Sequence, residues 1–197
     1  MRVYVADTLF KQLQYEVNWL QPAGMPRFTC FMSNCKCPYG YSRFTIEAVP
    51  WHKNLRAVLR NVAKSLNINI DFTCANLNLY HGTQQSVDWH SDNEKLFGPN
   101  PTILSISLGS SRKFCVRPRN DYRNVITYSL EHGDVCLMQG NLQQTHQHQV
   151  PKEYYNDPES LRINITARVI TNCTCNAYVA PVSPEWSIPI PTHSSGS

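Results

Sequence analysis

From residue 73 onward, apolar and polar positions alternate in short stretches that turn residues separate. Alternation over about four to eight residues is typical of strands with one face in a core. The pattern predicts strands at residues 73–80, 86–90, 102–108, 112–117, 124–130, 134–139, 146–150 and 162–170. Short strands in this number and at this spacing favour a mainly β fold, either a sandwich or a jelly roll.

Two amphipathic stretches before these strands predict helices that flank the sheet. The first covers residues 7–20, where apolar positions recur at helical spacing, and we expect Asp7 to cap it. The second covers residues 52–66 and sets an apolar stripe against a basic face, so we expect it to support the sheet. Residues 25–49, between the two, are irregular and rich in aromatic residues and cysteine.

The chain has the composition of an ordinary folded domain, with 197 residues and 42% hydrophobic residues. Its apolar runs are far shorter than the ~20 residues that a membrane span requires. The start of the chain lacks the charged and apolar regions of a signal peptide. We therefore expect no membrane association and a reducing compartment, either the nucleus or the cytoplasm or both.

A net charge of +4 permits binding to a polyanion without requiring it. Basic residues gather on one predicted hairpin, where they fit either a solvated surface or contact with phosphates. These residues are Arg112, Lys113, Arg117, Arg119 and Arg123.

His90 and Asp92 lie two positions apart, so an extended strand places both side chains on one face. A remote histidine could complete a metal site, and His146 and His148 share a face, so alternation alone does not choose between them. Two imidazoles and one carboxylate form the facial triad of non-haem Fe(II) oxygenases, which leaves coordination positions open. A surface turn with a chance His-x-Asp pair is the alternative interpretation.

The last predicted strand places Arg162, Asn164 and Arg168 on one face. The two arginines are roughly 20 Å apart along the strand, and side chains folded toward each other could bracket a short dicarboxylate such as 2-oxoglutarate. Asn78 and Tyr80 also share a face and can hydrogen-bond the same ligand. A surface strand alternates in the same way, so the pattern alone does not prove a binding site.

A series of motifs follows one order along the chain, at residues 78–80, 89–94, 105–109, 132–134, 148–151 and 162–168, preceded by residues 25–29, 39–42 and 50–52. In this order they resemble the AlkB family of nucleic-acid demethylases, and in particular its animal DNA and RNA repair members. The resemblance spans roughly residues 5–170. It implies a double-stranded β-helix, which is a jelly roll, with an N-terminal helical and flap region.

The resemblance also implies an organisation of the chain. An N-terminal helix would occupy residues 1–24, a nucleotide-recognition flap residues 25–49, and the oxygenase core residues 50–172. A C-terminal tail would occupy residues 173–197. This tail is rich in proline beyond Asn176, and we expect it to be extended or disordered.

By the same resemblance, the metal is Fe(II), and His148 is its third ligand beside His90 and Asp92. Arg162 and Tyr80 would hold the far carboxylate of the co-substrate 2-oxoglutarate. The metal-side end of 2-oxoglutarate would be held by Asn78, Asn164 and Arg168.

Three residues would contact the methylated base. The resemblance implies that Tyr39 and Tyr41 line the site, and that Glu94 hydrogen-bonds the exocyclic amino group of the base. Aromatic side chains in strands are often plain core residues, and Glu94 could instead face solvent.

The activity that the resemblance implies is oxidative demethylation of 1-methyladenine or 3-methylcytosine in DNA or RNA, which repairs alkylation damage. It would consume O2 and release formaldehyde and succinate. The expected partner of this monomer is a single strand, or a duplex with a flipped base. Two alternatives are a 2-oxoglutarate oxygenase that acts on protein or lipid, and a nucleic-acid-binding module without turnover.

The chain contains 8 cysteines, which we expect to be mostly reduced. Cys35 with Cys37, and Cys173 with Cys175, could form a four-thiolate zinc site if the flap and the C-terminal segment meet. A spacing of one residue is not that of the usual zinc knuckle, and the AlkB pattern does not call for such a site.

Overall fold

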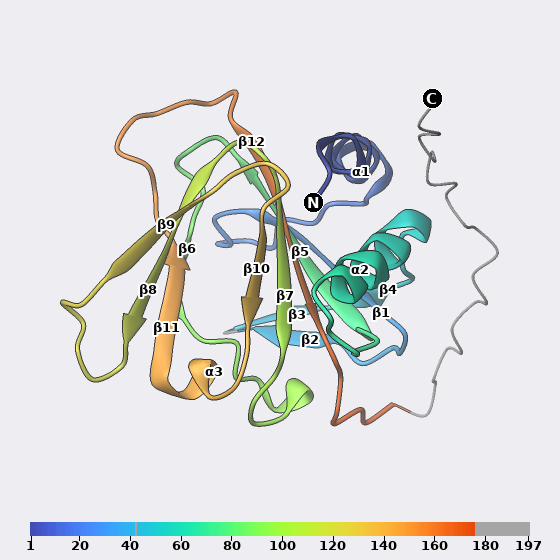
Figure 1. Ribbon diagram of the computed structural model, residues 1–197. Coiled ribbons are helices and arrows are strands. Elements are labelled where there is room, and N and C mark those ends of the chain that lie inside the picture. The colour runs from blue at the N-terminus through green and yellow to red at the C-terminus, as the bar shows by residue number, and fades with distance from the viewer. Residues whose placement is uncertain (42, 176–197) are drawn as a thin grey trace, which may run out of the picture.

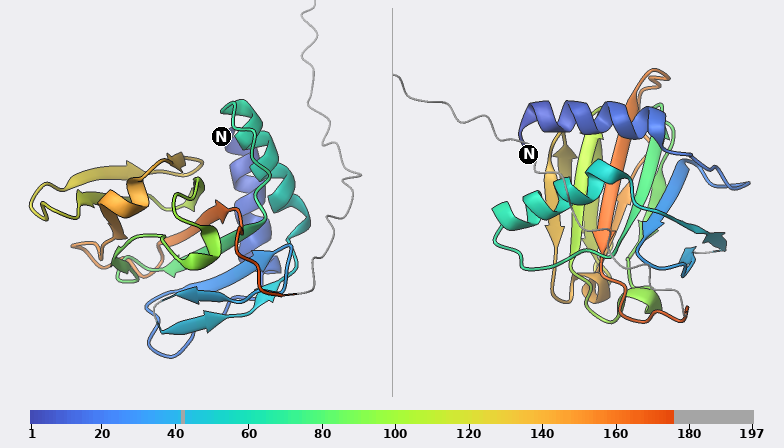
Figure 2. Two further views of the ribbon diagram at one scale, coloured as in Figure 1. Left: turned by 90° about the horizontal axis from the view of Figure 1, so that it is seen from below. Right: turned by 90° about the vertical axis from the view of Figure 1, so that its right-hand side faces the viewer.

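The computed structural model describes residues 1–41 and 43–175. Two β-sheets lie face to face, and two helices cover the outer face of the larger one (Figure 1, Figure 2). In spatial order, the larger sheet consists of β10 (Val135–Met138), β7 (Ile103–Gly109), β12 (Leu161–Arg168), β5 (Cys74–His81), β1 (Phe28–Ser33) and β4 (Ala48–Val49). The smaller sheet consists of β6 (Val87–His90), β11 (His146–Val150), β8 (Arg112–Pro118) and β9 (Ile126–Leu130).

Each predicted strand is present, with ends that differ from the prediction by at most two residues. Because the strand order within each sheet is not the sequence order, the chain crosses repeatedly between the two sheets. This arrangement confirms the mainly β, jelly-roll fold class. A separate hairpin of β2 (Tyr39–Tyr41) and β3 (Phe44–Ile46) lies in the predicted flap.

Strand β12 shows how alternation divides the larger sheet into two faces. Ile163 and Ile165 are fully buried and belong to the apolar cluster that includes residues of both helices. Arg162 and Asn164, at the intervening positions, pair in register with Tyr80 and Asn78 of β5. The larger sheet therefore has an apolar face toward the helices and a polar face toward the smaller sheet.

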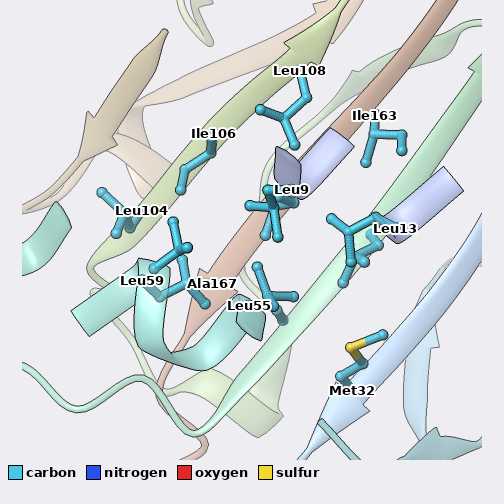
Figure 3. Packing of buried hydrophobic residues seen from close by; sticks show 14 of the residues in the cluster. Leu9, Leu13, Met32, Leu55, Leu59, Leu104, Ile106, Leu108, Ile163 and Ala167 are labelled. Carbon is cyan, nitrogen blue, oxygen red and sulfur yellow. The ribbon is translucent and has the colours of Figure 1, made fainter. Parts of the chain in front are cut away.

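The apolar face is closed by α1 (Val3–Glu16) and α2 (Lys53–Ser65). Leu9 and Leu13 of α1, with Leu55 and Leu59 of α2, point toward the sheet (Figure 3). All four leucines are at most 1% exposed. This layer is the main hydrophobic core, and it fixes the sheet that carries the polar face.

The prediction for the first helix was wrong about its start and its cap. The helix begins at Val3, so Asp7 lies inside it, and the side chain of the N-cap residue, Arg2, makes no capping hydrogen bond. Asp7 instead places Oδ1 3.1 Å from Nε2 of His132. The buried Ala6, one turn before the expected core positions, shows that the apolar stripe starts earlier than the cap residue suggested. The second helix agrees with the prediction, and its N-cap is His52.

Gly109 ends β7 at a position that only glycine fits. Its φ of +87° lies in the left-handed region, and an added Cβ would clash with the carbonyl oxygen of Leu161 and with the ring of Phe10. We expect Gly109→Ala to lower the free energy of unfolding by more than about 2 kcal/mol, because backbone strain and a backbone clash add. Chemical denaturation of the variant measures this.

Gly40→Ala is the matched control, because Gly40 has no heavy atom within 4 Å of an added Cβ. An equal loss of stability in the two variants would contradict this account of Gly109.

Among the described helices, none is long and apolar enough to cross a membrane. The Pro-rich tail that we predicted to be extended or disordered begins at residue 176 and lies outside the described residues, as does residue 42 of the motif at 39–42.

Candidate metal centre

The polar face of the larger sheet and the inner face of the smaller sheet enclose a small cavity. Strands β5 and β12 contribute Asn78, Tyr80 and Asn164 to its lining from one side. Strands β6 and β11 contribute His90 and His148 from the other. Alternate side chains of a strand point to opposite faces of its sheet. The polar residues of both sheets therefore lie between them.

His90, Asp92 and His148 meet at one end of this cavity. The Cα atoms of His90 and His148 are paired directly in the β6–β11 ladder, and Asp92 follows β6 by two residues. Nε2 of His90 lies 3.8 Å from Oδ1 of Asp92, and Nε2 of His148 lies 3.7 Å from Oδ2. One ligand atom from each residue lies within 4.8 Å of the others, so the three could hold one ion.

Hydrogen bonding fixes the orientation of His90. Its Nδ1 lies 2.8 Å from the carbonyl oxygen of Asp88, and because a carbonyl only accepts, Nδ1 carries the proton. Nε2 therefore presents its lone pair toward Asp92. A hydrogen bond from the ring nitrogen that does not bind the metal commonly orients histidine ligands in this way.

The two histidines are poised as neutral ligands. Burial, together with the neighbouring His90, lowers the pKa of His148 to about 3. Burial also lowers the pKa of His90. Neutral imidazole is the form that coordinates metals, so neither ring needs to lose a proton near neutral pH.

Asp92 is buried and ionised because Arg168 accompanies it. Nη2 of Arg168 lies 2.7 Å from Oδ1 of Asp92, and both side chains are nearly inaccessible to solvent. Burial alone would raise the pKa of Asp92, but Arg168, followed by His148 and His90, holds that pKa well below its usual value. The backbone N–H of Asp92 also donates to Oε1 of Gln143, at 2.9 Å.

Arg162 is fully buried, yet it forms no ion pair within the described residues. Its Nη2 donates to Oγ of Ser107 at 3.0 Å, but Nε and Nη1 have no hydrogen-bond partner. Burial, and then the nearby Arg112, lower the pKa of Arg162. An unpaired buried guanidinium is costly, and a planar carboxylate is the group that its donors fit.

The two arginines that we expected to bracket one dicarboxylate differ in their contacts. Arg168 lines the cavity and is paired with Asp92, whereas Arg162 is not among the lining residues. The ring of Tyr80 lies beside Arg162, with the guanidinium carbon 5.3 Å from the ring centroid. Asn78, Tyr80 and Asn164 line the cavity as the sequence suggested.

The site residues fit Fe(II) and 2-oxoglutarate on chemical grounds. Two neutral imidazoles and an ionised carboxylate are the donor set of a facial triad. Arg162, whose Nε and Nη1 lack acceptors, has free donors that could bind a carboxylate of 2-oxoglutarate.

The flap contributes Tyr39 and Tyr41 to the lining of the cavity, and Tyr39 contacts Glu94, which follows Asp92 by two residues. The hydroxyl of Tyr39 donates to Oε1 of Glu94 at 2.7 Å, and Oε2 of Glu94 is buried without a partner. Burial and the neighbouring Asp92 raise the pKa of Glu94, and burial raises that of Tyr39. Tyr39 and Tyr41 line the cavity, and the Tyr41 ring lies 5.7 Å, centroid to centroid, from that of His90. Glu94 is therefore not a solvent-facing carboxylate.

Sequence reasoning gave no role to Arg27 or Gln143. Nε of Arg27 donates to Oδ1 of Asn78 at 2.8 Å, and its guanidinium carbon lies 5.5 Å from the Tyr41 ring centroid. Arg27 thus joins the flap side of the cavity to β5. The signals in the sequence were its place in the motif at residues 25–29 and its position directly before β1.

Arg112 corrects the interpretation of the basic hairpin. It is 1% exposed, so it is neither solvated nor available to phosphates. Its Nη2 donates to the carbonyl oxygens of Gln85 and Pro151, and Nε lies 3.4 Å from Oε1 of Glu153. The alternation of β8 turns this side chain inward, whereas Lys113, the next residue, is exposed.

Comparisons with known proteins identify relatives of this chain. Residues 6–168 match the 2OG-Fe(II) oxygenase superfamily. The alpha-ketoglutarate-dependent dioxygenase alkB homolog 3 of Bos taurus is 37% identical over 198 residues, which cover 92% of this chain and 65% of that protein. The DNA oxidative demethylase ALKBH2 of Arabidopsis thaliana is 28% identical over 196 residues, which cover 83% of this chain and 62% of that protein. The chain thus spans slightly less than two thirds of these curated relatives.

The solved structure of OsALKBH1 superposes with a TM-score of 0.60 at 15% sequence identity, and the match covers 83% of this chain and 91% of that one. At this identity the likeness shows a common fold. A jelly roll with two histidines and an aspartate around one point defines the class of non-haem Fe(II) oxygenases. The chain belongs to the 2OG-Fe(II) oxygenase superfamily, and its similarity to the alkB homologues agrees with the motifs in its sequence.

Proposed function

We propose that the chain is an Fe(II)- and 2-oxoglutarate-dependent dioxygenase that removes methyl groups from N-alkylated bases in nucleic acid. Its substrates are 1-methyladenine and 3-methylcytosine, and its products are formaldehyde, succinate, CO2 and the unmodified base. Fe(II) with 2-oxoglutarate and O2 supplies the oxidation of the methyl C–H bond. The protein positions the reacting groups and keeps water out.

The observation that carries this proposal is the buried, unpartnered Oε2 of Glu94. Glu94 follows the metal ligand Asp92 by two residues, and Tyr39 occupies its other oxygen. Both proposed bases carry an exocyclic amino group, which donates hydrogen bonds. A buried acceptor beside a metal site is suited to such a donor, because an apolar methylene chain would leave it unsatisfied.

The residues that line the cavity, together with Arg162 next to Tyr80, have distinct roles in this proposal. Arg162, with Tyr80, binds the far carboxylate of 2-oxoglutarate, and Asn78 and Asn164 orient its other end. Arg168 keeps Asp92 ionised and in place. Tyr39 and Tyr41 provide aromatic faces against which an extruded base can stack.

The outer side of the smaller sheet supplies positive charge near the metal ligands. The guanidinium carbon of Arg117 lies 4.0 Å from the ring centroid of Trp89 and 4.4 Å from that of Tyr122. Nη2 of Arg119 donates to Oγ of Ser91, at 2.8 Å, between the ligands His90 and Asp92. These groups suit phosphate contacts along a single strand or beside a flipped base. We propose that the enzyme acts as a monomer in the nucleus, the cytoplasm or both.

The direct test is an assay of the purified protein with Fe(II), 2-oxoglutarate, O2 and an oligonucleotide that contains 1-methyladenine or 3-methylcytosine. We expect formaldehyde and succinate in equal amounts. Succinate formation stimulated by a peptide or lipid, without formaldehyde from the oligonucleotide, would move the substrate to that class. Oligonucleotide binding without either product would favour a module that lacks turnover.

Tyr39→Phe is expected to impair recognition of the methylated base more than binding of 2-oxoglutarate. The variant keeps the ring but removes the hydroxyl that holds Glu94 at 2.7 Å. Loss of one hydrogen bond to a charged group costs about 1.5–3 kcal/mol, so we expect kcat/KM for the methylated oligonucleotide to fall roughly 10- to 150-fold. KM for 2-oxoglutarate should remain within a factor of two or so.

Tyr128→Phe is the control, because Tyr128 is 50% exposed and lies on β9, an edge strand of the smaller sheet. If Tyr39→Phe left kcat/KM for the oligonucleotide unchanged, Glu94 would not depend on Tyr39 for recognition of the base.

A further inference from the structure

A second cluster of possible metal ligands lies apart from the triad and plays no part in the proposed reaction. Cys35 and Cys37 belong to the connection between β1 and β2, and Cys173 and Cys175 follow β12. The two segments are more than 130 residues apart in sequence, yet the four sulfur atoms all lie within 4.8 Å of one another. The flap and the segment after β12 therefore meet, which was the condition for a four-thiolate site.

The four sulfur atoms lie close together without forming a disulfide bond. Sγ of Cys37 lies 2.9 Å from Sγ of Cys173, which in turn lies 3.2 Å from Sγ of Cys175. A disulfide bond is much shorter, at about 2.05 Å. With Zn–S bonds of about 2.3 Å, the edge of a tetrahedral four-sulfur site is about 3.8 Å. Both measured spacings are shorter than this edge, and all four sulfur atoms lie within 4.8 Å of one another, so a small outward shift would admit one ion.

The surroundings of the cluster stabilise sulfur in its ionised form. The backbone N–H of Thr174 donates to Sγ of Cys37 at 3.3 Å. The hydroxyl of Ser33 lies 3.5 Å from Sγ of Cys35 and can donate to it. Donors of this kind commonly support the thiolate ligands of a metal. Cys35 and Cys37 are at least 94% buried, so they are shielded from bulk solvent.

We propose that Cys35, Cys37, Cys173 and Cys175 bind one structural Zn²⁺ ion. Four thiolates fill a tetrahedral shell, and a closed shell of this type is structural because it leaves no position for a substrate. Sulfur donors also distinguish this site from the triad, whose nitrogen and oxygen donors suit iron. The two sites would thus select different metals in one chain.

The zinc ion would join the flap to the segment that follows β12. Tyr39 lies two residues after Cys37, and it is the residue that holds Glu94. On the other side, the backbone N–H of Thr171 donates to the carbonyl oxygen of Leu96, next to the same glutamate. The ion would therefore fix the position of the flap relative to the metal centre without contacting it.

The test compares zinc contents in an Asp92→Asn background, in which the triad is weakened so that it does not obscure the count. Protein produced in zinc-supplemented medium and desalted is analysed by elemental mass spectrometry. We expect about one zinc per chain, which falls to near zero in the Cys173→Ser/Cys175→Ser double variant. Cys136→Ser in β10, outside the cluster, is expected to retain the zinc.

Cobalt provides a measurement that does not depend on the folding of the cysteine double variant. Reconstitution of the Asp92→Asn protein with Co²⁺ should produce intense sulfur-to-cobalt charge-transfer absorption, which added Zn²⁺ then abolishes. Chains without zinc, retention of zinc in the double variant, or the mass loss of disulfide formation in protein purified with reductant would each overturn the proposal.

Discussion

Asp92→Asn is expected to abolish formaldehyde release from a methylated oligonucleotide while the chain stays folded. Asparagine has nearly the same shape and keeps an oxygen that can accept from Nη2 of Arg168, which now lies 2.7 Å from Oδ1. It lacks the negative charge that the metal needs. We expect the affinity for Fe(II) to fall by more than the roughly 10- to 100-fold that loss of an outer partner costs. An anaerobic Fe(II) titration measures this.

Alanine would be a poorer choice at this position, because it would leave the Arg168 charge buried without a partner. Breaking a buried ion pair in this way costs about 3–5 kcal/mol, so loss of activity would be confused with loss of structure. Asp88→Asn is the matched control, because Asp88 lies on β6, four residues before Asp92, with an exposed side chain, and its backbone carbonyl rather than its carboxylate contacts His90. Undiminished Fe(II) binding by Asp92→Asn would remove Asp92 from the metal site.

The second large effect is expected from Arg162→Met, which should weaken 2-oxoglutarate binding without destabilising the unliganded protein. Arg162 is fully buried with Nε and Nη1 unpartnered, so removing its charge relieves a desolvation cost. When the co-substrate carboxylate is present, the same change deletes one partner of a buried charge pair. That loss costs about 2–5 kcal/mol, or roughly 30-fold to several thousand-fold in Kd.

Arg168→Met is the matched comparison, because it is expected to destabilise the unliganded protein whereas Arg162→Met is not. Its guanidinium already has a partner in Asp92, so the metal-free variant should lose about 3–5 kcal/mol of stability. Thermal denaturation without metal or 2-oxoglutarate, followed by calorimetric titration with 2-oxoglutarate, separates the two effects. A fall in the melting temperature of unliganded Arg162→Met as large as that of Arg168→Met would contradict the view that Arg162 is unpaired.

Sequence periodicity predicted the strands and the two faces of β12 because both follow from local geometry. Ile163 and Ile165 had to share a face, and an apolar face had to be buried. The start of α1 was missed for the opposite reason. Asp7 is a good capping residue by local rules, but its contact with His132 and the coverage of the sheet by Ala6 depend on the tertiary fold.

The metal site was likewise predicted partly from local sequence spacing, whereas the rest depends on contacts between distant segments. The spacing of His90 and Asp92 predicted a shared face, but only the resemblance to a family selected His148 over His146. Direct pairing of His90 with His148 supplies the physical reason, because neighbouring strands bring these two rings together. The pairing of Arg112 with Glu153 could not be predicted, since it joins segments 41 residues apart.

The two different faces of β12 also determine the register in which the strand pairs with β5. A shift of one residue in its pairing with β5 would turn Arg162 and Arg168 toward the helices and their apolar core. The same shift would carry Ile163 and Ile165 to the metal side, where they would leave polar groups without partners. Mispairing is thus penalised on both faces at once. The residues that serve the chemistry also protect the chain from folding into the wrong register.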